Sequence, residues 1–199
     1  MPRAGLTPQI VGAEAARLAD EVGFDRLTLA AIAESFGVAV PSLYKHVDGL
    51  DGVRRDLAAR AVRELGDTLR AAVDASDGAE LPALAYAYRA YAKSHPGRYA
   101  ATLRAPNPRD AEHIAASEFT LSTVFAVLAR YELTGEDAVD ATRALRAALH
   151  GFVSLEANGG FGMPQDVDRS FQRLVAAIDA TLRDWKRSTE VPPDDSRVP

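Results

Sequence analysis

One short stretch, residues 28–47 (TLAAIAESFGVAVPSLYKHV), constrains the fold more than any other part of the chain. Apolar residues recur at helical spacing after Thr28, whose hydroxyl can accept a hydrogen bond from a free amide of the first turn. Gly37 supplies a turn, because glycine adopts a left-handed backbone at little cost. Pro41 falls in the first turn of a second helix, where a missing amide proton does no harm. The stretch therefore predicts two short helices joined by a tight turn.

This arrangement is a helix-turn-helix, and a second helix of that kind enters the major groove of DNA. The charge balance is unusual for such a role, because the formal net charge of the 199-residue chain is −5. The first 56 residues also hold more acidic than basic side chains. Since few phosphates can be neutralised, we expect modest non-specific affinity for DNA and a shallow salt dependence.

Three short motifs carry a resemblance to a known family: Gly37-Val38, then Pro41-Ser42-Leu43-Tyr44, then His46-Val47. Together with the long amphipathic helix that follows, they make about residues 7–56 similar to TetR repressors of the tetracycline-repressor type. The resemblance implies a homodimeric repressor that binds a palindromic operator on double-stranded DNA and is released by a small-molecule effector. The DNA-contacting positions that it implies, with Lys45 added for its charge, are Thr28, Val40, Pro41, Ser42, Tyr44, Lys45 and His46.

Several positions depart from the family pattern at the expected DNA surface. Ala30 stands in place of a base-reading arginine, Val40 in place of a polar reader, and Leu50 in place of a lysine. Each missing bidentate contact removes about 1–3 kcal/mol of base discrimination. The candidates to restore positive charge are Arg54 and Arg55. An alternative function therefore stays open: a ligand-binding or interaction protein of the same fold, with weak or lost DNA binding.

The rest of the chain indicates an all-α protein, because alanine is abundant and long β-branched runs are scarce. We predict a three-helix DNA-binding domain over residues 1–50, a helical ligand-binding and dimerisation bundle over 51–189, and a disordered tail over 190–199. Further helices are expected at 7–22, about 51–75, between Gly78 and Pro96, and at 98–103, 110–131, 136–157 and 166–186. With no apolar run long enough to span a membrane and no signal-peptide pattern, we expect a cytoplasmic protein.

A second motif, Leu149-His150-Gly151-Phe152, resembles the C-terminal domain of a TetR subgroup characterised by Trp-His-Gly, with Leu149 in place of the tryptophan. This likeness covers about residues 80–185 and implies an effector pocket and a dimer interface formed by the helices at 136–157 and 166–186. The last helix carries a broad apolar stripe that favours a partner surface, although it could also pack within the monomer.

Aromatic and polar side chains of the C-terminal helices are candidates for lining that pocket. Such a mixture is typical of small-molecule sites, yet tyrosines at helical spacing also fit a core, and a polar row also fits a solvated face. The candidates are Tyr88, Tyr91, His95, Phe119, Phe125, His150 and Ser154.

Catalysis has little support in the sequence. The four histidines are scattered without metal-ligand spacing, there is no cysteine, and no G-x-S-x-G motif occurs. We therefore expect a regulator that is not an enzyme and needs no metal or cofactor.

Overall fold

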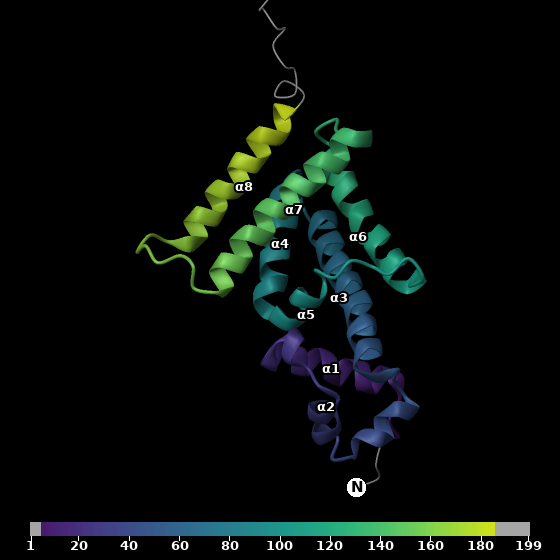
Figure 1. The fold of residues 1–199 in the computed structure, drawn as a ribbon. Coiled ribbons are helices and arrows are strands. Elements are labelled where there is room, and N and C mark those ends of the chain that lie inside the picture. Colours follow the sequence, from purple (N-terminus) through teal and green to yellow (C-terminus); the bar gives the residue numbers. More distant parts are fainter. Residues whose placement is uncertain (1–4, 186–199) are drawn as a thin grey trace, which may run out of the picture. The chain divides into compact units, whose positions relative to one another are not determined.

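The computed structural model describes residues 5–185, and over this range it consists of helices, turns and loops without a strand (Figure 1). The predicted all-α class is confirmed. The chain forms two compact units, which divide between Val124 and Phe125 within α6 (Ala111–Ala129). The tail predicted at 190–199 lies outside the described residues. No helix within 5–185 has the length and apolar character needed to cross a membrane.

The first unit begins with the predicted helix-turn-helix, built from α1 (Pro8–Val22), a short 3-10 turn η1 (Phe24–Arg26), α2 (Leu29–Ser35) and η2 (Val40–Lys45). The Thr28 hydroxyl accepts from Ala31 N at 3.1 Å, and Gly37 has φ +63°, so the predicted cap and turn are confirmed.

The second helix of the motif, η2, is a 3-10 helix. Its hydrogen bonds join residues three apart, from Ser42 N to Ala39 O at 2.9 Å and from His46 N to Leu43 O at 2.8 Å. Pro41 lies in the first turn of this segment, where the missing amide donor is tolerated.

Three further helices complete most of the first unit: α3 (Gly49–Asp74), α4 (Glu80–Ser94) and α5 (Pro96–Ala101). The hydrophobic core of the helix-turn-helix continues into α3 and α5, so the motif has no core of its own that ends at residue 50. Its buried members are Val11, Ala15, Leu18, Ala19, Phe24, Leu27, Ile32, Ala33, Leu43, Val53, Leu57, Ala58, Ala61 and Ala101.

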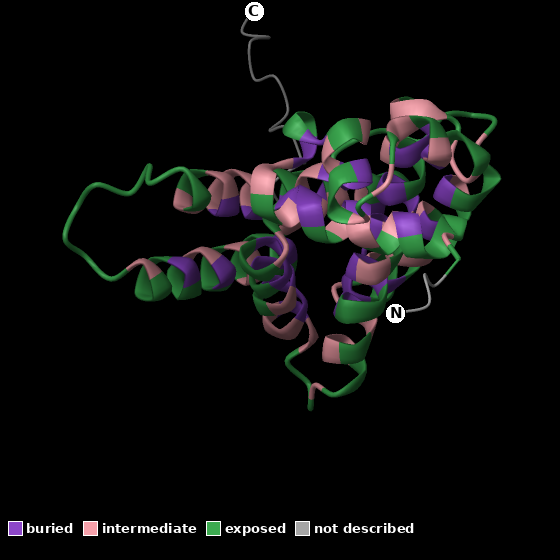
Figure 2. Ribbon diagram, turned by 90° about the horizontal axis from the view of Figure 1, so that it is seen from below, coloured by how far each residue is buried: buried purple, intermediate pink, exposed green. Residues whose placement is uncertain are grey.

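The second unit contains the end of α6, then α7 (Gly135–Ala157) and α8 (Val167–Arg183). The Phe152 ring on α7 packs against Phe171 on α8, with ring centroids 5.0 Å apart. The Tyr131 hydroxyl donates to Asp179 Oδ1 at 2.5 Å. The segment that joins α7 to α8 is exposed over residues 157–166, and Figure 2 shows it as a long green loop.

Candidate functional site

The surface expected to read DNA lies on η2, which is anchored by one residue. Leu43 is fully buried at 0 % exposure, whereas the next side chain, Tyr44, is 61 % exposed. Pro41 and Lys45 are also exposed, and Ser42 and His46 are half-buried. The fold thus brings Pro41, Ser42, Tyr44, Lys45 and His46 together on one short segment.

Two other expected DNA residues have structural contacts. Thr28 is exposed, and its hydroxyl is the cap of α2. Val40 packs partly buried against the hydrophobic core, which limits the surface that it can offer to a base. Any contact of either residue with DNA stays a prediction.

Arg54, a candidate from the sequence to restore positive charge to this surface, has structural partners of its own. Its Nη2 donates to Asp25 O at 2.9 Å and to Leu27 O at 3.3 Å, and the guanidinium lies over the Phe24 ring at 5.9 Å. The side chain therefore ties the η1 turn to α3. A guanidinium matches the two backbone carbonyls that a turn leaves without partners, and this use competes with phosphate binding.

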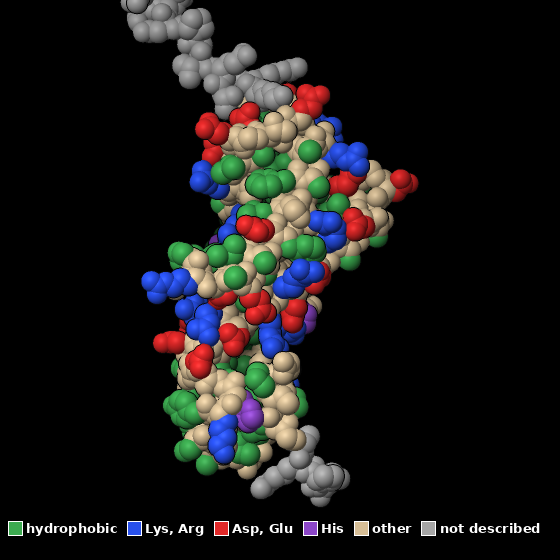
Figure 3. All heavy atoms as spheres, turned by 90° about the vertical axis from the view of Figure 1, so that its right-hand side faces the viewer, with side chains coloured by type: hydrophobic (Ala, Val, Ile, Leu, Met, Phe, Trp, Pro, Cys, Tyr) green, Lys and Arg blue, Asp and Glu red, His purple; other side chains and the backbone are tan. Residues whose placement is uncertain are grey.

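Arg55 is a weak candidate for binding phosphate, because two carboxylates lie near its guanidinium. Its guanidinium lies 3.7 Å from Asp48 Oδ2 and 3.6 Å from Asp56 Oδ1. On α1, Arg17 pairs with Glu14 and Glu21. Figure 3 shows a mostly hydrophobic or uncharged surface at the lower end, where α2 and η2 lie. Lys45 is the basic residue that η2 itself supplies.

A polar cluster lies behind this surface, where α1, α3, α4 and α5 meet. The backbone N of Arg98 donates to Asp20 Oδ1 at 2.8 Å, and its Nε donates to Asp20 Oδ2 at 2.8 Å. Its Nη1 donates to Glu64 Oε2 at 2.9 Å, and its Nη2 lies 2.6 Å from His95 Nδ1. The Tyr91 hydroxyl donates to Ala61 O at 3.2 Å and to Glu64 Oε2 at 3.4 Å.

Burial and charge both act on this cluster. Desolvation lowers the pKa of Arg98, but its hydrogen bonds to Asp20 and Glu64 outweigh that effect and hold the pKa above its usual value. Desolvation and the nearby Glu64 carboxylate raise the pKa of Tyr91. The guanidinium is therefore charged and the phenol neutral at physiological pH, so the contacts persist as charge-assisted hydrogen bonds.

The aromatic residues expected to line an effector pocket have defined partners inside the first unit. Tyr88 and Tyr99 share a hydrogen bond of 2.9 Å between their hydroxyls, with both rings buried. Tyr91 and His95 lie together, with ring centroids 5.1 Å apart, as part of the polar cluster. The Phe119 ring lies 3.9 Å from the Arg63 guanidinium.

The remaining pocket candidates belong to the second unit. Phe125 is 38 % exposed, and His150 and Ser154 are partly buried on α7. Among residues 5–185 there is no group of three or more His, Asp or Glu side chains placed to hold a metal ion.

The sequence analysis did not predict that Asp20, Glu64 and Arg98 would join Tyr91 and His95 in one polar cluster. Asp20, Glu64 and Arg98 are far apart in the chain, and charged residues at such separations carry no local signal. A clue was available in Pro96-Gly97, which the sequence indicated only as a helix stop. A Cβ on Gly97 would lie 1.9 Å from Ala19 O, so this glycine permits close contact between α5 and α1.

Known proteins resemble this chain both in the N-terminal helix-turn-helix and in the C-terminal helices. Residues 13–47 match the family model for bacterial regulatory proteins of the tetR family, and residues 81–178 match the tetracyclin repressor-like C-terminal domain. The HTH-type transcriptional regulator Rv0681 of Mycobacterium tuberculosis is 41 % identical over 166 residues, which cover 82 % of this chain and 75 % of that protein.

Two further relatives extend the agreement. The HTH-type transcriptional regulator YobS of Bacillus subtilis is 34 % identical over 167 residues, which cover 83 % of this chain and 87 % of that protein. The structure of a TetR variant from Acinetobacter baumannii in complex with minocycline shares the fold, with a TM-score of 0.64, 22 % identity and coverage of 94 % and 99 % of the two chains.

Both parts of the described chain thus define a DNA-binding helix-turn-helix regulator with a repressor-like C-terminal domain. The chain belongs to the TetR family of transcriptional regulators, which confirms the resemblance seen in the sequence. Members of this family bind DNA operators and small-molecule effectors, form dimers and are not normally enzymes.

Proposed function

We propose that the protein is a cytoplasmic homodimeric repressor that binds a palindromic operator through η2 and leaves it when a small molecule binds. The observation that carries this proposal is the construction of η2. Leu43 is buried at 0 % exposure and fixes the segment, while Pro41, Tyr44 and Lys45 are presented to solvent. Such a segment can enter a major groove as a rigid unit, with side chains that reach bases and phosphates.

Dimerisation would set the spacing of the two DNA-reading segments. We assign the interface to α7 and α8, because both keep apolar side chains open to solvent, with Leu155 on α7 51 % exposed and Leu174 and Ile178 on α8 partly exposed. Two such helices from each subunit make a self-complementary four-helix interface. Recognition segments about 34–36 Å apart then fit successive major grooves of a palindromic site.

The effector would act by differential affinity for two states of the dimer. The relative solved with minocycline supports small-molecule binding by a protein of this fold. The residues that we propose for the effector region are Tyr88, Tyr91, His95, Phe119, Phe125, His150 and Ser154. Tyr91 and His95 share the polar cluster with Arg98, which binds Asp20 on α1. A shift of α4 or α5 would therefore be transmitted to the DNA-binding helices.

The proposal is tested by selecting bound fragments from random-sequence DNA with the purified protein. Recovery of a palindromic motif, whose affinity falls with Ser42→Ala or Tyr44→Ala while the dimer stays intact, supports it. Arg109→Ala is the matched control, because Arg109 is an exposed basic residue on the loop before α6 and is not part of η2. Enrichment of no motif by a folded dimer contradicts operator binding.

One observation favours a second function, that of a ligand-binding protein of this fold with weak DNA affinity. Arg54 is bound to the backbone of the η1 turn, and Arg55 lies beside Asp48 and Asp56. The electrostatic part of DNA binding is correspondingly small. The same selection separates the two functions, since this one predicts no enriched motif.

A further inference from the structure

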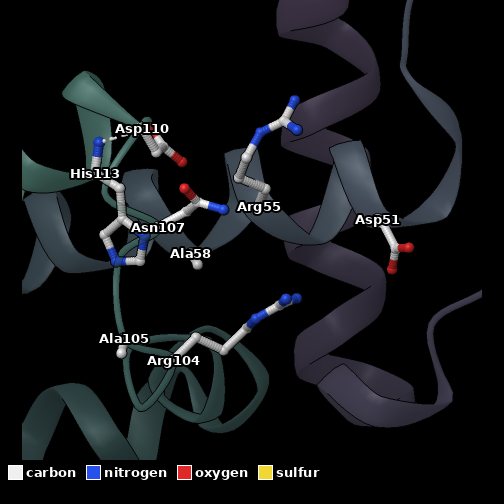
Figure 4. Close-up of a pocket in the computed structure, with 8 residues that line it drawn as sticks. All are labelled: Asp51, Arg55, Ala58, Arg104, Ala105, Asn107, Asp110 and His113. Carbon is white, nitrogen blue, oxygen red and sulfur yellow. Dashed lines mark hydrogen bonds between the residues drawn. The ribbon is translucent and has the colours of Figure 1, made fainter.

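A cavity of about 320 Å³ lies between the first turns of α3 and the segment that joins α5 to α6 (Figure 4). Its α3 wall contains Asp51, Arg55 and Ala58, and the opposite wall contains Arg104, Ala105, Asn107, Asp110 and His113. The volume is at the lower end of the range found for small-molecule sites. In Figure 4 the side chains of Arg104 and Asn107 extend from the joining segment toward α3.

Opposite charges stand on the two walls without neutralising each other. Arg104 and Asp51 both line the cavity, yet neither forms an ion pair or a side-chain hydrogen bond with any residue in the range 5–185. Arg55 lies beside Asp48 and Asp56 but is half-exposed and faces the same space. Since Asp110 also lines the cavity, guanidinium groups (Arg55, Arg104) and carboxylates (Asp51, Asp110) are both present for a ligand to bind.

Polar groups of the α6 side add directed hydrogen bonds. Asn107 Oδ1 accepts from Arg109 N at 2.9 Å, which leaves the amide Nδ2 as a donor. Asp110 Oδ1 accepts from His113 N at 3.0 Å. The His113 side chain lines the cavity, is 2 % exposed, and has a buried Nε2 with no hydrogen-bond partner.

We propose that this cavity binds a small zwitterion of the amino acid class. Its carboxylate would accept from Arg104 and the Asn107 amide, and its ammonium would donate to Asp51. A molecule that carries both charges can pair with a guanidinium and a carboxylate of the walls at the same time, whereas a plain anion or a plain cation can pair with one kind only.

This site is separate from the effector region proposed above and does not depend on operator binding. None of the aromatic residues assigned to that region lines the cavity. The cavity wall begins at Asp51 in the first turn of α3, a few residues after η2. A ligand here would contact the start of α3, the helix whose buried residues share a hydrophobic core with the helix-turn-helix.

The test is calorimetric titration of the full-length protein with each proteinogenic L-amino acid, and with acetate and methylammonium as single-charge probes. We expect at least one amino acid to bind with a dissociation constant of about 1 mM or lower, and more tightly than either single-charge probe. Arg104→Ala and Asp51→Asn should each weaken binding about tenfold or more, because each removes one charge-assisted contact. Arg109→Ala, on the same exposed loop, should leave binding unchanged.

Absence of binding by every amino acid overturns the proposal. Acetate that binds as tightly as the best amino acid also overturns it and indicates a simple anion site. Equal loss of affinity in Arg104→Ala and Arg109→Ala would overturn it too, because the effect would then come from the general charge of the loop. Circular dichroism of each variant is the control for folding, and we expect spectra like that of the original protein because the substituted side chains are exposed.

Discussion

Arg98 on α5 binds Asp20 on α1 through two hydrogen bonds, one from its backbone N and one from its Nε, each 2.8 Å long. The same guanidinium donates to Glu64 on α3 at 2.9 Å. One side chain thus connects the first helix of the DNA-binding motif with the long helix and with the start of the C-terminal region. A displacement of α5 would therefore be felt directly by α1 and α3.

We predict that Arg98→Ala lowers the free energy of unfolding by about 1–3 kcal/mol, because Asp20 and Glu64 both lose a charged donor in a half-buried site. Urea denaturation measures the change. Arg143→Ala is the control, since Arg143 pairs with Asp140 on an exposed surface of α7. If Arg143→Ala lowers the free energy of unfolding as much as Arg98→Ala does, the polar cluster contributes no more to stability than an exposed ion pair.

Gly97→Ala should be strongly destabilising, by about 1–3 kcal/mol or more, because the new methyl group would overlap the backbone of Ala19. Gly12→Ala provides a comparison on α1. There the added Cβ meets only the end of the Arg60 side chain, at 3.0 Å, which can move away. Thermal unfolding should show a large drop in Tm for the first variant and little change for the second. Equal midpoints for the two variants would contradict the close α1–α5 contact.

Arg54→Ala should reduce stability, whereas Arg55→Ala should change it little. Arg54 satisfies the carbonyls of Asp25 and Leu27, which would be left without this donor. Removing one partner of such a contact costs about 1–3 kcal/mol. Denaturation of both variants checks this. The structural role assigned to Arg54 is wrong if its variant keeps full stability and loses only DNA affinity.

Stability should fall as the pH drops below about 6.5, and His113 should contribute to this fall. Burial lowers the pKa of His113 from its ordinary value of 6.5, with Asp110 opposing and Arg104 assisting the effect. Below that pH the unfolded state binds more protons than the folded state, so the free energy of unfolding decreases with decreasing pH. One such group contributes at most about 1.4 kcal/mol per pH unit.

Denaturation at about pH 7.5 and about pH 5.5 tests this dependence. His113→Gln should lose less stability between the two pH values than the original protein does, even if it starts from a lower value. An unchanged difference would show that other groups account for the whole pH effect.

Local sequence signals predicted the helix-turn-helix well, since caps and turns depend on neighbouring residues. Thr28 caps α2, and Gly37 makes the turn, because each acts within a few residues of itself. Leu43 and Val40 lie three residues apart, at helical spacing, and both pack toward the core. The 3-10 geometry of η2 was missed, because spacing over six residues does not separate the two helix types.

Long-range partners were beyond local reasoning. Arg54 was a candidate phosphate ligand because of its charge and position, but carbonyls of Asp25 and Leu27 bind it. The tyrosines of α4 were expected at a pocket, and the structure gives Tyr88 and Tyr91 hydrogen-bonded positions inside the first unit. Which carbonyl or hydroxyl a side chain meets depends on the packing of distant helices, which the periodicity of one helix does not encode.

Operator binding through η2 is tested most directly by fluorescence anisotropy. The purified protein is titrated against the DNA upstream of its own gene, at low and moderate salt. We predict saturable binding that withstands competitor DNA. Lys45→Ala should make the slope of log affinity against log salt less steep by about 0.9, because it removes one positive charge that neutralises a phosphate. Arg109→Ala should behave like the original protein. Weak binding that disappears with salt and is unaffected by Tyr44→Ala and Lys45→Ala would contradict an operator-reading role for η2.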